Sequence, residues 1–238
     1  MADQKIYKLY DGEVEVKFNV GNHQYFVDGK KTQGVTTILG VLGKPQLIYW
    51  AVDCAIKNLQ AVLDAGERID ESHLESAKSA HVTAKTTAGD TGATVHRWVE
   101  CYLKGMNPAM PEGDALNSVN AFLTWEKSHQ VEWMELERVV YSRQFDYVGR
   151  FDAIAKIDGK LSLIDFKTSK SIYPEMLFQV SAYRQAYEEE VGKKEMQNVI
   201  LRFDKITGEP HTEIAKYPKE DFDTFRACLI IKKRELLK

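Results

Sequence analysis

The sequence predicts an α+β protein, with a mixed sheet flanked by helices and preceded by an N-terminal β-hairpin and a helical cap. Three successive sequence patterns predict it. Apolar residues alternate with period two over the first thirty positions, take a helical spacing from about Thr36 to Lys104, and then return to short apolar runs separated by helical stretches. We therefore expect three regions, residues 1–34, 35–130 and 131–238, packed as one compact unit.

Size and composition limit the classes of protein that the chain can belong to. The 238 residues, 44% of them hydrophobic, are enough for one well-packed core. No run of about 18 apolar residues would cross a membrane, and the start, Met1–Lys5, has neither a signal core nor a transit character. The three cysteines lie far apart without a CxxC pair. We therefore expect no disulfide framework, no zinc site and a reducing cytoplasm, bacterial or that of a host cell if the protein is viral.

The N-terminal region has the pattern of a small antiparallel sheet. Val14, Val16 and Phe18 would share one face of a strand. Residues 23–27 would form a second strand that ends in an Asp-Gly turn, so we expect a β-hairpin here.

The helical region contains an apolar stripe and a glycine-rich interruption. The stripe consists of Leu47, Trp50, Ala51, Cys54 and Ile56. Gly-Asp-Thr-Gly at 89–92 is expected to end one helix and open another over 93–103. A loop at 107–113 and an amphipathic helix over 114–128 would follow.

The second half predicts the order β-β-β-α-β-β-α. Strands are expected at 136–141, 148–157, 161–166, 199–203 and 213–216, and helices from about Pro174 and from about Glu220. Pro174 suits the first turn of its helix, where no backbone N–H is needed.

The segment 149–170 carries the strongest chemical signal. Asp-Gly at 158–159, between two apolar runs, is typical of a two-residue hairpin loop, because a type I′ turn needs positive φ at both positions. Counting back along the ladder from that loop places Asp152 opposite Asp165, with Cβ atoms roughly 5 Å apart. Lys167 lies two residues beyond Asp165 and therefore shares its face.

Two carboxylates that face each other repel unless something compensates their charge. A hard divalent cation would do so, with Asp152 and Asp165 supplying oxygen ligands. Lys167 would then orient or help deprotonate an attacking water, or offset charge on a phosphorane-like transition state, as phosphodiester hydrolysis requires. The alternative is an ordinary edge carboxylate at 152 and a solvated strand end at 165–167. A bulge in the hairpin would also shift the pairing.

Several short motifs, which cover nearly the whole chain after about residue 34, form a set typical of one family. They are Val35-Thr-Thr-Ile-Leu39, Gly92-Ala-Thr-Val-His96, Gly149-Arg-Phe-Asp152, Asp165-Phe-Lys167-Thr-Ser and Gln179-x-x-x-Tyr183. The set resembles the RecB-like branch of the PD-(D/E)XK nucleases, which includes CRISPR-associated RecB-like and mitochondrial genome maintenance exonucleases. The resemblance implies an α/β/α, restriction-endonuclease-like core.

The resemblance also implies roles for individual residues. His96, Asp152 and Asp165 would be ligands of Mg²⁺ or Mn²⁺, together with the backbone carbonyl of Phe166. Asp152, Asp165 and Lys167 would form the catalytic set. Glu137 matches the additional acidic position of the family; Glu135 is a near alternative, and either residue would otherwise be a solvated strand position.

Further residues are expected to contact DNA. Gln179 and Tyr183 share a helix face and would lie beside the active site, although Tyr183 would also fit an apolar stripe. Thr168, Ser169 and Lys170 follow the strand end, where hydroxyl and ammonium groups bind phosphates. These three would otherwise be plain surface residues.

The sequence departs from the family in three places. Only Cys228 lies downstream, so we expect no iron-sulfur cluster. Gly40–Pro45 lacks the spacing and the hydroxyl of a phosphate-binding loop, so we expect no nucleotide cofactor. Phe151 takes the place of the proline that precedes the first aspartate, an absence that is common in the RecB-like branch.

These observations favour a stand-alone DNA exonuclease of recombination, repair or genome processing that acts on single strands or strand ends. The net charge of −3 gives no bulk attraction to nucleic acid, so phosphate binding must come from local cations. The helical cap would form an arch or wall over the site, with Trp50 or Trp98 stacking on bases or lying in the core. A structure-specific or nicking endonuclease and a non-catalytic DNA-binding module are the alternatives. The sequence indicates no particular protein partner.

Overall fold

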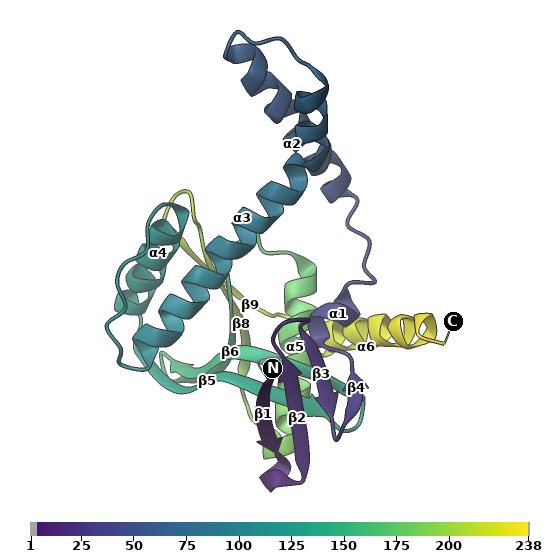
Figure 1. Ribbon diagram of the computed structural model, residues 1–238. Coiled ribbons are helices and arrows are strands. Elements are labelled where there is room, and N and C mark those ends of the chain that lie inside the picture. The colour runs from purple at the N-terminus through teal and green to yellow at the C-terminus, as the bar shows by residue number, and fades with distance from the viewer. Residues whose placement is uncertain (1–3, 238) are drawn as a thin grey trace.

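The strands gather into two separate sheets in the computed structural model, which describes residues 4–237 (Figure 1). One sheet has the order β1-β2-β3-β4 and the other the order β5-β6-β7-β8-β9. The elements in chain order are β1 (Gln4–Leu9), η1 (Tyr10–Gly12), β2 (Val14–Asn19), β3 (Gln24–Val27), β4 (Lys30–Thr32), α1 (Val35–Leu39), α2 (Gln46–Asp64), α3 (Glu71–Leu103), α4 (Asp114–Ser128), β5 (Val131–Ser142), β6 (Tyr147–Ile157), β7 (Lys160–Lys167), α5 (Pro174–Val191), β8 (Gln197–Phe203), β9 (Pro210–Ile214) and α6 (Pro218–Glu235). The order predicted for the second half is confirmed.

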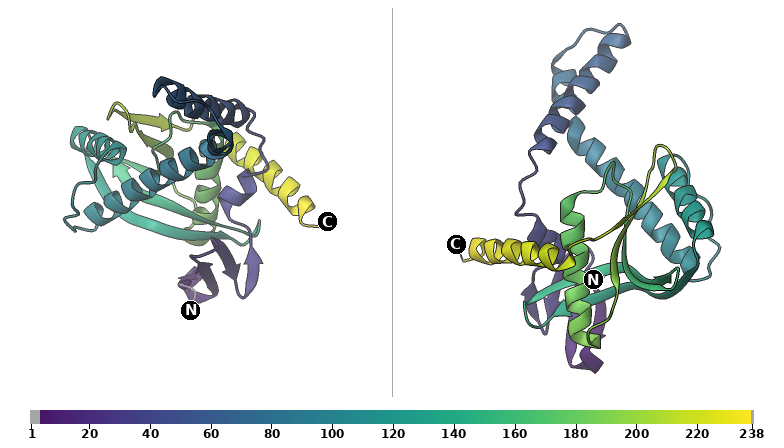
Figure 2. Two further views of the ribbon diagram at one scale, coloured as in Figure 1. Left: turned by 45° about the horizontal axis from the view of Figure 1, so that its top comes forward. Right: turned by 180° about the vertical axis from the view of Figure 1, so that it is seen from behind.

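The larger sheet is mixed and lies between two layers of helices. β7 and β8 run parallel, whereas the other neighbours are antiparallel. A parallel pair cannot be joined by a tight turn, and α5 supplies the crossover between these two strands. Helices α1, α5 and α6 pack on one face, and α3 and α4 pack on the other (Figure 2). The expected fold, a mixed sheet flanked by helices, is therefore confirmed.

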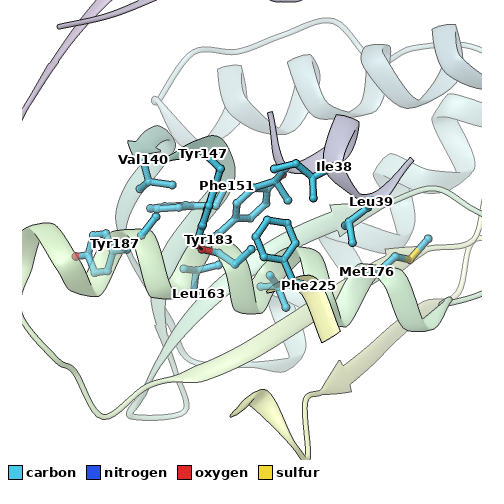
Figure 3. Close-up of a cluster of buried hydrophobic side chains, with 14 of the residues drawn as sticks. Ile38, Leu39, Val140, Tyr147, Phe151, Leu163, Met176, Tyr183, Tyr187 and Phe225 are labelled. Carbon is cyan, nitrogen blue, oxygen red and sulfur yellow. Dashed lines mark hydrogen bonds between the residues drawn. The ribbon is translucent and has the colours of Figure 1, made fainter. Parts of the chain in front are cut away.

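The core on the α5 face is built around aromatic side chains (Figure 3). Phe151 of β6 packs edge-on against Tyr187 of α5, with ring centroids 5.7 Å apart. Tyr147 meets Phe225 of α6 in the same manner at 4.9 Å. Burial of each such side chain contributes roughly 1.5–3 kcal/mol relative to leaving it in water, so this cluster joins α5 and α6 firmly to the sheet.

The opposite face of the sheet packs on α3 and α4. Ile164 and Phe166 of β7 point to this side and contact the cluster around Phe122 and Trp98. Leu163 belongs to the α5 cluster instead, as the alternation of a strand requires. β7 is therefore buried on both faces, which explains its nearly continuous apolar run.

The smaller sheet packs beside the larger one through valines. Val14 and Val16 of β2 are buried against Val139 of β5 and Val148 of β6. The predicted N-terminal hairpin is present, but it is part of a four-stranded antiparallel sheet to which β1 and β4 also belong.

Helix α2 and the N-terminal half of α3 form an arm that projects from the body (Figure 1). The predicted break at 89–92 is wrong: α3 runs without interruption from Glu71 to Leu103. Glycine costs roughly 0.5–1 kcal/mol in a helix interior, too little to end a helix whose last three turns pack on the core. The apolar stripe of α2 is not buried, and no residue of α2 is.

β9 runs from Pro210 to Ile214, so it begins and ends earlier than the strand predicted at 213–216. Among residues 4–237, no helix combines the length and the apolar character that crossing a membrane requires.

Substitution of Gly149 or Gly89 by alanine should have opposite effects on the stability of the protein. A Cβ on Gly149 would stand 2.5 Å from the Tyr183 ring, whereas a Cβ on Gly89 would meet nothing within 4 Å. We expect Gly149→Ala to lower the free energy of unfolding by about 1–3 kcal/mol through overpacking. Gly89→Ala should raise it by about 0.5–1 kcal/mol. Urea denaturation of both variants tests this, and equal effects would contradict the close packing of α5 on β6.

Candidate active site

A cleft of about 1140 Å³ opens where the two sheets, α3 and α5 meet. Its walls come from β1–β3, the start of α1, the middle of α3, the β6 segment from Val148 to Asp152, and α5. The lining includes His96, Asp152, Asp165 and Lys167, which the sequence analysis had singled out. Residues far apart in the chain are therefore brought into one concave surface.

Three side chains in this region can offer ligand atoms to one cation. A ring nitrogen of His96 and carboxylate oxygens of Glu137 and Asp152 all lie within 4.8 Å of one another. His96 Nδ1 lies 3.1 Å from Asp152 Oδ1, and the Phe166 N–H donates to Asp152 Oδ2 at 2.6 Å. Both oxygens of Asp152 are thus held in place, one by α3 and one by β7.

The backbone is irregular where Glu137 and Asp152 meet. Glu137 has φ of 52°, a left-handed value that is rare for a residue inside a strand. In β6, Phe151 packs on the α5 side and Ala153 on the α4 side, so the regular alternation breaks at Asp152. Strained backbone of this kind is concentrated at functional sites, and here it turns two acidic side chains toward His96.

A bulge in β5 decides which glutamate takes part. The β5–β6 register shifts by one residue between Trp133 and Glu135, so Glu137 lies opposite Asp152. Without that extra residue, Leu136 would lie there. Glu135 instead accepts hydrogen bonds from Arg138 at 2.5 Å and Tyr187 at 2.7 Å. The structure thus brings Glu137, and not its near alternative, to the cluster.

The predicted hairpin register is confirmed up to the catalytic candidates. β6 and β7 pair from Ile157–Lys160 to Ala153–Ile164 without a bulge. The ladder ends at that pair, so Asp152 and Asp165 do not form the expected facing pair. The Asp152 carboxylate instead accepts a hydrogen bond from the Phe166 N–H.

Asp165 is buried and lies beside Lys167. Only 3% of Asp165 is exposed. The Lys167 ammonium forms an ion pair with Asp165 Oδ2, although the contact lacks the geometry of a hydrogen bond. The lysine therefore compensates the second aspartate, while His96 compensates the first.

The pKa values of these acidic groups are shifted by burial and by the charges around them. Burial raises the pKa of Glu137 to about 7, and the Asp152 carboxylate adds to the rise. Burial also raises the pKa of Asp165, against the opposing effect of Lys167. For Asp152, burial is outweighed by His96 and Lys167, so its pKa is lowered. Burial lowers the pKa of His96, but Asp152 raises it by more.

The donor set fits a divalent cation. Carboxylate oxygens suit Mg²⁺ and Mn²⁺, and imidazole is a common ligand of transition-metal ions. A strand residue carries its N–H and C=O on the same edge. The bond from the Phe166 N–H to Asp152 therefore places the Phe166 carbonyl on the edge that faces the cluster. A cation bound here would relieve the repulsion among the carboxylates.

Gln179 and Tyr183 line the cleft together. The Gln179 amide donates to the Tyr183 hydroxyl at 2.5 Å. The Tyr183 ring is buried against Gly149, which also supports the alternative that this tyrosine belongs to the apolar stripe of α5. The glycine before Arg150 is needed because any larger residue would displace the ring.

The remaining predicted residues lie outside the cleft lining. The Thr168 hydroxyl lies against Gly92, where a Cβ would stand 3.2 Å from it. Ser169 bonds within its own turn, and Lys170 is exposed. Their contact with DNA stays a prediction.

Neither Trp50 nor Trp98 lines the cleft. Trp98 is buried, and its indole N–H donates to the Ala109 carbonyl at 3.1 Å. Trp50 lies on the arm and does not line the cleft. The helical region was expected to form an arch or wall over the site, and the stretch of α3 from Asp90 to Arg97 forms one wall of the cleft.

The sequence analysis missed several residues that line the cleft. Arg150 lies two positions before Asp152 and forms an ion pair with Glu137 at 3.1 Å. Arg97 follows His96, and Lys5 comes from β1. Motif position was the available signal for the arginines, but no local pattern pointed to Lys5.

Comparison with known proteins identifies the family. Residues 114–237 match the model of the PD-(D/E)XK nuclease superfamily. Among solved structures, 16 chains match. One is the crystal structure of SSO0001, with a TM-score of 0.35 and 18% sequence identity, covering 79% of this chain and 73% of that one. No curated protein matches the sequence.

The two neighbouring glutamates offer a matched test of the cation site. We expect Glu137→Gln to weaken Mn²⁺ binding by about tenfold or more, since even residues behind the ligands cost 10–100-fold in metal affinity. Glu135→Gln should change it by less than about twofold, because its partners are Arg138 and Tyr187. Isothermal titration calorimetry measures both, and equal affinities would remove Glu137 from the ligand set.

Proposed function

Because this chain belongs to the PD-(D/E)XK nuclease superfamily, we propose that it is a metal-dependent deoxyribonuclease that removes nucleotides from the ends of single strands. Membership implies metal-dependent nuclease activity and a nucleic-acid substrate, and nucleases of this superfamily use divalent metals. The observation that carries the proposal is that His96, Asp152 and the Asp165–Lys167 pair line one cleft, and that Glu137 lies close enough to share a cation with His96 and Asp152.

The proposed ligands of the cation are His96, Glu137, Asp152, Asp165 and the Phe166 carbonyl. A bound Mg²⁺ or Mn²⁺ would polarise the phosphate and lower the pKa of a bound water. The protein must hold these ligand atoms close together, although the carboxylates repel one another. Asp152 is positioned for this by its bonds to His96 and to the Phe166 N–H.

Lys167 is the proposed catalytic lysine. Its ammonium is held beside Asp165 and lines the cleft. There it can orient the attacking water and offset the negative charge that develops on the phosphoryl oxygens. Gln179, held by the Tyr183 hydroxyl, would position the sugar-phosphate backbone from the α5 side.

The size of the cleft favours a single strand. Its volume of about 1140 Å³ is slightly above the range of small-molecule sites, which suits a short unpaired segment better than a duplex. Lys5 and Arg97 lie on different walls, and neither forms an ion pair with any residue between 4 and 237. Both are therefore free to bind phosphates. Removal of nucleotides from strand ends would serve recombination, repair or genome processing.

Substrate topology separates the exonuclease from an endonuclease. We expect end-labelled single-stranded DNA to be shortened progressively with Mg²⁺ or Mn²⁺ and to stay intact with EDTA. Closed circular single-stranded DNA should resist, because it offers no end. A gel time course measures both. Cleavage of the circle would point to an endonuclease, and no hydrolysis of any DNA or RNA would leave only a binding module.

Lysines at the two ends of β7 give a matched test of catalysis. We expect Lys167→Ala to lower the hydrolysis rate by about 10²–10³-fold or more, the usual effect of losing a group that stabilises transition-state charge. Mn²⁺ binding should persist, because the ligands remain. Lys160→Ala, at the exposed hairpin end, should keep the wild-type rate. Single-turnover kinetics on an end-labelled strand measures the rates, and a normal rate for Lys167→Ala would overturn the mechanism.

A further inference from the structure

The N-terminal sheet contributes a row of side chains to the wall of the cleft. Lys5, Phe18 and Tyr25 are direct partners across β1, β2 and β3. Directly paired positions share one face of a sheet. All three line the cleft, as does the exposed His23 at the tip of the hairpin.

The aromatic pair lies where the packing of this sheet on the body ends. The preceding pair on the same face, Val16 and Val27, is buried. Phe18 and Tyr25 follow two residues along each strand and remain partly exposed, with ring centroids 4.7 Å apart. Both aromatic side chains therefore leave part of their apolar surface exposed to the cleft.

Short contacts connect this pair to the cation site. Gly34 lies against the Tyr25 ring and bridges to Val148 at the start of the motif in β6. Burial raises the pKa of the Tyr25 hydroxyl, and the nearby Arg150 guanidinium opposes that rise. Arg150 in turn forms the ion pair with Glu137. The Arg150 side chain therefore links the Phe18–Tyr25 pair to the carboxylate of Glu137.

We propose that Phe18 and Tyr25 form a stacking platform for an unpaired nucleobase of the strand whose phosphate lies at the cation site. Aromatic rings bind single-stranded nucleic acid by stacking on the base face, with little dependence on sequence. In a duplex these faces are already covered by neighbouring bases. Lys5, beside Phe18 in the row, would bind a flanking phosphate. This inference rests on the proposed nuclease function and identifies its substrate as an unpaired strand.

Substitutions at Phe18 test the platform by affinity. A 5′-labelled single-stranded oligonucleotide is titrated by fluorescence anisotropy with Mg²⁺, in a Lys167→Ala background so that the strand is not consumed. We expect Phe18→Leu, which keeps apolar packing but lacks an aromatic face, to weaken binding by roughly 5- to 100-fold. Phe18→Trp should retain it. Phe26→Ala is the control, because Phe26 lies on the opposite face of β3 and outside the cleft.

Abasic substrates distinguish stacking from loss of folding. A single abasic nucleotide is moved along the oligonucleotide. With Phe18 present, we expect one position to lose as much affinity as Phe18→Leu does. With Phe18→Leu, the abasic penalty at that position should vanish while the others persist. Equal penalties in both proteins, or wild-type affinity for Phe18→Leu, would overturn the platform.

The stacking platform and the nuclease activity can be refuted independently of each other. Affinity is measured without hydrolysis, so a protein that binds through Phe18 but never cleaves DNA would refute the nuclease activity alone. A protein that degrades strand ends at the wild-type rate after Phe18→Leu, with unchanged affinity, would refute the platform alone.

Discussion

The convergence of acidic side chains at one point of the sheet is the constraint on which the rest of the structure depends. Glu137, Asp152 and Asp165 are brought together in a partly or fully buried place, where like charges repel strongly. The fold provides partners from different elements: His96 of α3 contacts Asp152, and Lys167 of β7 pairs with Asp165. This compensation is incomplete, as the raised pKa of Glu137 indicates, and a divalent cation would complete it.

Close packing of helices on the sheet delivers the groups that surround this point. Gly92 allows α3 to approach Thr168 at the end of β7, so that His96, one turn later, reaches Asp152. Gly149 allows the Tyr183 ring of α5 to lie on β6, where it holds Gln179 toward the cleft. Each glycine lies a few residues before a residue of the site: Gly92 before His96, and Gly149 before Asp152. Their role is steric, because neither has positive φ.

The cleft is completed by a part of the chain that carries no nuclease motif. β1, β2 and β3 supply Lys5, Phe18 and Tyr25 to one wall, whereas the helical arm, where aromatic contacts were expected, points away from the body. In our proposal, metal binding and strand binding are therefore divided between the two sheets. The ion pair between Arg150 and Glu137 lies where these two functions meet.

The sequence by itself determined the features that depend on local backbone geometry. The Asp-Gly turn set the register of the β6–β7 hairpin, and with it the shared end of the ladder at which Asp152 and Asp165 lie. It also predicted α4 at its observed bounds and the order of the second half. Only the tertiary structure decided that α3 continues through 89–92, and that Glu137 rather than Glu135 joins the cluster. The physical reason is that these outcomes depend on packing and on a bulge in a partner strand, whose energies come from residues far away in the chain.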